Sequence, residues 1–188
     1  MTPRDTWLLC EDANLLAECN VYFYKSSGPG GQHRNKTSSA VRLHHRPSGV
    51  SAHGDESRSQ HENKRLAVKR LRMNIACRCR QTPDPTEASI PPVVAECLHA
   101  YRRSSVGPGA RDGKRPANRL TVGRRDHRFW PVAAFVLDLL DANTGRLAQA
   151  AMRLGISTGN LSAFLTSERH LLAAAQAIRK THAQKPHH

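Results

Sequence analysis

The sequence predicts an α+β fold: a small β-sheet of about three strands covered by a long basic α-helix, followed by a linker and a C-terminal helical module. Three observations lead to this prediction. Two short stretches, 19–24 and 40–45, alternate side chains with the period of two that is typical of a strand. From 57 to about 80, apolar residues recur at helical spacing among many lysines and arginines. Four prolines between 83 and 92 then interrupt the chain.

The composition indicates a nucleic-acid partner. The 188 residues include 29 Lys and Arg against 15 Asp and Glu, a formal charge of +14. A basic surface that serves only solubility is the alternative, although acidic residues serve solubility better. Hydrophobic residues make up 38% and aromatic residues 5% of the chain, so the cores are expected to be small and aliphatic.

The sequence shows no sign of a membrane, a metal or a cofactor. No run approaches the 18 apolar residues of a spanning helix, and the first residues lack the apolar segment of a secretory signal. The five cysteines are an odd set, and Cys77 and Cys79 are too close for the usual zinc-ligand spacing. His44 and His45 have no partner at ligand spacing. We therefore expect reduced thiols in a cytoplasmic protein.

The first half of the chain, 1–80, is predicted to be one domain. A short helix within 1–16 precedes a strand at 19–24, and further strands are expected at 40–45 and 50–53. Pro47 and Gly49 suit a type I turn between the last two strands.

The helix that follows is expected to cover this sheet, because three strands alone are too few to be stable. Ser57 and Gln60 have the spacing of a capping box at its start, and Leu71 and Ile75 lie on its apolar face. Its other face is either a solvated charged surface or an RNA contact. The basic residues of this face are Lys64, Arg65, Lys69, Arg72 and Arg78.

The second half is predicted to begin with a linker over 81–127 that contains a short helix near 92–103. A helical module over 128–180 and a disordered tail over 181–188 follow. In the module, Gly155 ends one helix and Ser157 caps the next, the pattern of a helix-turn-helix. This module either only packs as a bundle or binds rRNA, tRNA or a partner protein.

The most informative segment is the glycine loop, defined as residues 26–38, Ser-Ser-Gly-Pro-Gly-Gly-Gln-His-Arg-Asn-Lys-Thr-Ser. Glycine and proline favour a loop here rather than a strand. Closely spaced glycines also let the main chain approach another molecule with no Cβ in the way. The loop therefore presents Gln32, with basic and polar residues on both sides to hold phosphates.

This loop, together with Pro-Ser-Gly at 47–49 and Ser-Arg-Ser-Gln-His-x-Asn-Lys at 57–64, resembles the peptidyl-tRNA hydrolase domain of class I peptide chain release factors. The resemblance covers about 18–72. It implies hydrolysis of the ester between a nascent peptide and tRNA, with the ribosome, its large-subunit rRNA and peptidyl-tRNA as partners. It also implies that Gly30, Gly31 and Gln32 are the catalytic loop. The family's glutamine is commonly N-methylated, which implies a glutamine methyltransferase as a further partner.

The residues offer no convincing covalent nucleophile. No carboxylate lies near Ser26, Ser27 and His33 to complete a triad, and an amide cannot serve as a general base. Gln32 is therefore expected to act by placement, through its backbone N–H or by orienting water. Arg34 departs from the aliphatic residue usual in the family. The expected RNA contacts are Ser27, His33, Asn35, Lys36, Arg42, Arg58, Lys64, Arg65 and Lys69.

Within the family, the chain resembles the small, codon-independent members that rescue stalled ribosomes. Little sequence precedes the resemblance, and no Pro-x-Thr or Ser-Pro-Phe codon-reading motif is present. Two rival functions remain: a non-catalytic ribosome-binding factor, against which the intact Gly-Gly-Gln argues, and a DNA-binding regulator. The second predicted helix of the module begins with small polar residues and no arginine, which argues against specific DNA readout. These residues are Thr158, Gly159, Asn160 and Ser162.

Overall fold

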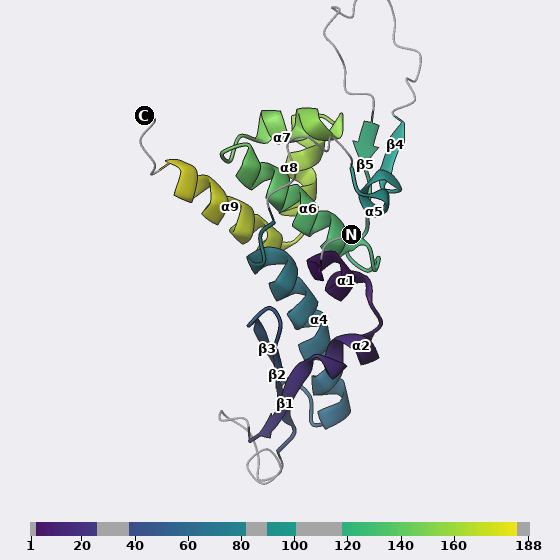
Figure 1. The fold of residues 1–188 in the computed structure, drawn as a ribbon, viewed down its shortest axis with the longest axis vertical. Helices are drawn as coiled ribbons and strands as arrows, with labels where there is room; N and C mark the ends of the chain where they lie inside the picture. Colours follow the sequence, from purple (N-terminus) through teal and green to yellow (C-terminus); the bar gives the residue numbers. More distant parts are fainter. Residues whose placement is uncertain (1–2, 26–37, 82–89, 101–117, 184–188) are drawn as a thin grey trace, which may run out of the picture. The chain divides into compact units, whose positions relative to one another are not determined.

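The computed structural model describes residues 3–25, 38–81, 90–100 and 118–183 (Figure 1). The chain divides into two compact units, Met1–Cys79 and Arg80–His188. The glycine loop lies outside the described residues except for its last position, Ser38.

The first unit is built on an antiparallel sheet of three strands, β1 (Cys19–Tyr24), β2 (Ala40–His45) and β3 (Ser51–Gly54), in that order. The predicted α+β class and three-stranded sheet are confirmed. Cys19 pairs with His45 at one end of the β1–β2 ladder, and Tyr24 pairs with Ala40 at the other. The glycine loop therefore connects two strand ends that are direct neighbours.

The hairpin between β2 and β3 is confirmed, but its turn differs from the prediction. The closing hydrogen bond runs from the N–H of Gly49 to the carbonyl of His45, at 2.9 Å, so the turn is one residue longer than a type I turn. Gly49 has φ 67°, in the left-handed region that glycine adopts at little cost. Strand β3 consequently starts at Ser51, one residue later than expected.

Helix α4 (Gln60–Arg78) packs against β2 and β3 (Figure 1). The helix buries Leu71 and Ile75, and β2 buries Val41 and Leu43. The predicted cap was wrong by two residues. Ser59, not Ser57, is the N-cap, and its side chain accepts a hydrogen bond from the N–H of Glu62. Ser57 and Ser59 match the local pattern of an N-cap equally well. Only the path of the chain into the helix decides which of the two is the N-cap.

The N-terminal segment forms two helices where one was expected, α1 (Pro3–Leu9) and α2 (Asp12–Ala17). Both contact α4, and α2 leads directly into β1. Their buried leucines, Leu8 and Leu15, extend the core of this unit.

The second unit begins differently from the prediction. Helix α5 spans only Pro92–Ala95, and Leu98–Ala100 form a strand, β4, instead of continuing the helix to 103. Strand β4 pairs with β5 (Asn118–Leu120), inside the segment predicted to be a linker. Pairing with β5, about 20 residues away in the chain, outweighs the helical spacing of the apolar residues. The prediction missed this because a local sequence pattern does not show the hydrogen bonds of a sheet.

Four helices follow: α6 (Phe129–Ala142), α7 (Leu147–Leu154), α8 (Thr158–Thr166) and α9 (Arg169–Ala183). Gly155 ends α7 in the left-handed conformation, at φ 65°, and Ser157 caps α8 by accepting from the N–H of Asn160. Both expectations are confirmed. Helix α9 runs to Ala183, so the first three residues of the predicted tail are helical.

The cysteines form no disulfide among the described residues, and Cys19 is one of the buried thiols. Burial raises the pKa of its thiol to about 11, and the thiol donates to the carbonyl of Leu15 at 3.1 Å. Because the thiolate is the reactive form, Cys19 should resist iodoacetamide at pH 8 until the protein unfolds. Mass spectrometry after short labelling measures this. Labelling of Cys19 in the native protein as fast as the partly exposed Cys77 would contradict the expectation.

Candidate functional site

Gly30, Gly31 and Gln32 lie outside the described residues. The same holds for four expected RNA contacts, Ser27, His33, Asn35 and Lys36. The structure instead describes how the loop is attached, at Tyr24 on β1 and at Ser38 before β2.

The chain that leaves the glycine loop is bound by the first turn of α4. Nε2 of Gln60 donates to the carbonyl of Ser38 at 3.1 Å, and Nδ2 of Asn63 donates to the carbonyl of Ser39 at 2.8 Å. We call these two acceptor residues the loop stem. Because main-chain groups are bound rather than side chains, the helix fixes the backbone path from which the loop departs.

Asn63 connects three segments at once. Its Nδ2 also donates to the carbonyl of Ser57 at 2.8 Å, and its Oδ1 accepts from the N–H of Ser57 at 2.9 Å. The side chain is fully buried. A buried amide with its donors and acceptor paired holds the loop stem, the approach to α4 and the helix itself in one arrangement.

The sheet and α4 approach each other closely at Gly54, the last residue of β3. A Cβ at this position would lie 2.2 Å from the carbonyl oxygen of Asn63 and 3.2 Å from the amide nitrogen of Ala67. Only glycine leaves room for the helix backbone here. The position of Asn63 relative to the loop stem therefore depends on Gly54, which is the last residue of the sheet in sequence order.

The basic residues that are both expected to contact RNA and described by the structure do not all lie on one surface. Arg42 is exposed on β2, and it alternates with Val41 and Leu43, which face α4, so Arg42 lies on the opposite side of the sheet from that helix. Arg65 and Lys69 are exposed one turn apart on α4. Of the remaining two, Arg58 is exposed before the helix and Lys64 is half-buried.

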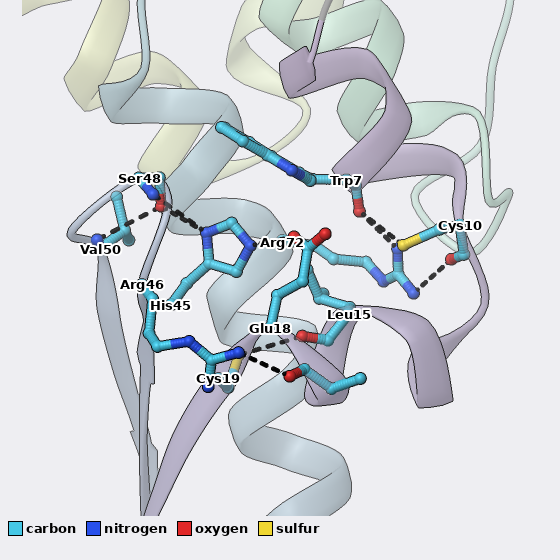
Figure 2. Close-up of polar contacts among 11 residues, drawn as sticks. Trp7, Cys10, Leu15, Glu18, Cys19, His45, Arg46, Ser48, Val50 and Arg72 are labelled. Atoms are coloured by element: carbon cyan, nitrogen blue, oxygen red, sulfur yellow. Dashed lines mark hydrogen bonds and ion pairs between the residues drawn. The ribbon is translucent and has the colours of Figure 1, made fainter.

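Arg72, assigned by the sequence to the RNA-facing side of α4, has another role. Its guanidinium donates to the carbonyls of Leu8 at 3.0 Å and Cys10 at 2.7 Å, and it pairs with Asp12 at 2.7 Å. It therefore satisfies acceptors left open at the end of α1 (Figure 2). The helical spacing predicted that Arg72 lies on the charged face of the helix. It could not show the partners of Arg72, because these lie about 60 residues earlier in the chain.

His45 has partners that the sequence did not reveal (Figure 2). Its Nδ1 lies 2.7 Å from Oγ of Ser48, its Nε2 lies 3.0 Å from Oε2 of Glu18, and its ring meets Trp7 edge-on. Serine, histidine and glutamate in series resemble a hydrolytic triad. However, His45 is fully buried, and Oγ of Ser48 also accepts from the N–H of Val50, inside the turn. The arrangement joins α2 to the β2–β3 turn and offers no exposed nucleophile.

The side of the sheet opposite α4 contains two tyrosines to which the sequence assigned no role. Tyr22 and Tyr24 on β1 line a hollow of about 380 Å³ with Arg42 and His44 on β2. Part of the signal was present, since alternate residues of one strand share a face, but the register that joins the two strands was not visible in the sequence. The alternation identified the strands, but it did not show which side of the sheet α4 covers.

In the second unit, the side chain of Asn160 has partners within the protein, although Asn160 was one of the polar residues considered for DNA readout. Its Oδ1 accepts from the N–H of Leu120 at 2.7 Å, and its Nδ2 donates to the carbonyl of Leu120 at 3.1 Å. The amide thus pairs with strand β5. Because both its groups are bound within the unit, Asn160 is not an available base-reading side chain.

Among the residues that the structure describes, no three His, Cys, Asp or Glu side chains come together as a metal site would require. None of the described helices has both the length and the apolar character needed to cross a bilayer.

Comparison with known proteins finds similarity in the segment that contains the sheet and its loop. A family model described as the RF-1 domain matches residues 16–91. Peptide chain release factor 1 of Mesoplasma florum is 44% identical over 117 residues, which is 60% of this chain and 28% of that protein. The Leptothrix cholodnii protein of the same name is 35% identical over 139 residues, 71% of this chain and 36% of that protein.

The chain thus spans about a third of the length of these relatives. The match includes the glycine loop, its stem, the three strands and α4. Residues 16–91 are therefore similar to the RF-1 domain, the family that the Gly-Gly-Gln loop resembles.

Proposed function

We propose that this protein hydrolyses the ester of peptidyl-tRNA within the ribosome and releases the nascent chain. The observation that supports this most strongly is the Gly-Gly-Gln sequence at 30–32 inside the segment that matches the RF-1 domain. The bound stem at Ser38 and Ser39 adds a physical argument, because a loop that acts by placement needs a fixed base.

In the proposed reaction, a water oxygen attacks the ester carbonyl carbon and the bond to the ribose oxygen breaks. The water loses a proton and the ribose oxygen gains one, so the products are a free carboxylic acid and deacylated tRNA. The backbone N–H of Gln32 stabilises the developing oxyanion, and its side chain orients the water. The ribosome supplies the remainder of the site. Gly30 and Gly31 let the main chain reach the ester without a steric clash.

We further propose that release does not require a stop codon, which makes the protein a rescue factor for stalled ribosomes in the cytoplasm. What supports this proposal is the resemblance of the chain to the small, codon-independent members of the family. The rival function of DNA readout loses support, since Asn160 is engaged by β5. N-methylation of Gln32 by a glutamine methyltransferase is part of the same proposal.

The test is peptide release from purified ribosomes stalled on an mRNA that lacks a stop codon. Wild-type protein should release the peptide. Gln32→Ala removes the side chain that orients the water, and Gly30→Ala and Gly31→Ala each add a Cβ that hinders the approach of the main chain, so each should slow release by about 100-fold. Binding to ribosomes, measured by co-sedimentation, should be unchanged, because only the loop tip is altered. Gln149→Ala, at an exposed position of α7, is the matched control and should release normally.

Two further substrates decide the finer claims. Equal release from ribosomes with a sense codon, a stop codon or no codon in the A site supports codon independence, and release only at stop codons contradicts it. Release only from separated large subunits would indicate a quality-control role instead of rescue of intact ribosomes. Normal release by Gln32→Ala would refute the proposed mechanism.

A further inference from the structure

One face of the sheet in the first unit combines exposed aromatic and basic side chains. We call it the aromatic face and define it by Tyr22, Tyr24, Arg42 and His44, which line one hollow. Helix α4 packs on the side of the sheet to which Val41 and Leu43 point, so the aromatic face lies on the other side.

The strand register places these side chains next to one another. Tyr22 pairs directly with Arg42, and Tyr24 follows two residues later on the same side. Directly paired residues have Cβ atoms about 5 Å apart, so the arginine lies beside the tyrosine ring. Across the sheet, Arg42 also pairs with the exposed His53 of β3. The face therefore has an aromatic edge on β1 and a basic centre on β2.

Two features give this face a defined shape. His44 is held by a hydrogen bond between its Nδ1 and Oγ of Ser51, at 2.9 Å. Tyr22 is 52% exposed and Tyr24 is 36% exposed, although both stand on a regular strand. Exposed aromatic rings on a rigid strand are pre-organised for contact, because little side-chain freedom is lost on binding.

The chemistry of the face matches unpaired RNA bases. Nucleobases stack on tyrosine rings irrespective of sequence, and arginine contacts phosphates or stacks on bases. The three strands contain no aspartate or glutamate, so nothing on them repels a phosphate backbone. A protein partner would instead be favoured by a more apolar centre, where this face has Arg42 and His44.

We propose that the aromatic face binds unstacked bases of large-subunit rRNA, with Tyr22 and Tyr24 as stacking platforms and Arg42 as the phosphate or cation–π contact. This inference rests on the proposed function, because β1 and β2 support the glycine loop on directly paired ends. A loop that enters the peptidyl-transferase centre brings these strand ends against rRNA. The face would then contribute affinity and orientation, while Gln32 contributes to the chemistry.

The neighbouring Phe23 provides a matched control. It lies between the two tyrosines and is 51% exposed, but its side chain points to the opposite side of the strand. A general loss of exposed aromatic surface would affect Tyr22 and Phe23 alike. A stacking role for the aromatic face affects only the tyrosines.

The experiment measures binding of the full chain to a labelled single-stranded oligoribonucleotide by fluorescence anisotropy, and to purified large subunits by co-sedimentation. Tyr22→Leu and Tyr24→Leu should each weaken both interactions by about 10-fold, the effect of one lost base stack. Tyr22→Phe keeps the ring and should bind as wild type. Arg42→Ala should reduce the slope of log affinity against log salt by about one, whereas Arg42→Lys should keep it.

Several outcomes would overturn the inference. The first is unchanged binding by both leucine variants, and the second is an equal loss of binding with Phe23→Leu. The third is weaker binding to large subunits with normal oligoribonucleotide affinity. This third outcome would indicate a ribosomal protein partner. The proposed function has a separate readout. Gln32→Ala should bind the oligoribonucleotide normally yet fail to release peptide, so normal binding by the leucine variants refutes the aromatic face alone.

Discussion

Replacing Gly54 by alanine is expected to destabilise the Met1–Cys79 unit by about 3 kcal/mol, the upper end of the usual cost of overpacking. The added Cβ would lie 2.2 Å from the carbonyl oxygen of Asn63. Because the clash is with main chain, no side-chain rotation relieves it. Helix α4 must move from β3, and the hydrogen bonds of Asn63 to Ser39 and Ser57 weaken with it.

Urea unfolding followed by Trp7 fluorescence measures this effect. The chain has two tryptophans, one in each unit, so a Trp130→Phe background leaves Trp7 as the reporter of the first unit. Gly49→Ala is the control. A Cβ there meets nothing within 4 Å, and only the φ of +67° is unfavourable, which costs about 1 kcal/mol. A loss for Gly54→Ala no larger than for Gly49→Ala would contradict the packing argument.

Asn63→Ala is expected to slow peptide release more than any other substitution outside the glycine loop. It removes the donors that hold the carbonyls of Ser39 and Ser57 and the acceptor for the N–H of Ser57. The loop stem then has more than one conformation, and the attacking group is less often placed correctly. Loss of positioning alone can cost about 100-fold in rate. Stability should fall by about 2 kcal/mol, because buried partners are left unpaired.

A positioning role is separated from a structural one by measuring the release rate at saturating protein, below the unfolding temperature. The rate constant should fall while ribosome affinity stays within a few-fold. Asn74→Ala is the matched control, because Asn74 also lies on α4 and donates to a strand carbonyl, that of Ser51 at 2.9 Å, away from the loop stem. Equal release defects for the two variants would show that general weakening of α4, and not the stem, is responsible.

Local patterns predicted the elements of the first unit well. The bounds of β1 and β2 agree with the alternating stretches, and the hairpin follows from Pro47 and Gly49. In the second unit, Gly155 and Ser157 terminate and cap their helices as expected. These features depend on residues close in sequence, where dihedral preferences and capping act.

The errors share a cause. Helix α5 was predicted too long because β5, the partner of β4, is contributed by a distant segment. Arg72 was assigned to a charged surface because the carbonyls at the end of α1 were not known to lie beside it. Asn160 was counted among the polar residues considered for DNA readout because its partner, the backbone of Leu120, belongs to another element. In each case a polar group found a partner that only folding brings near.

The sequence by itself determined the chemistry of the glycine loop, because this chemistry depends on residue types. Glycines have no Cβ atom, a glutamine cannot act as a base, and many lysines and arginines make the chain strongly basic. The tertiary structure alone decided which side of the sheet α4 covers, which glycine leaves room for α4 and which amide binds the loop stem. The physical reason is that packing distance and hydrogen-bond partnership depend on segments far apart in the chain, so Gly54 and Asn63 acquire their roles only when β3, α4 and the stem meet.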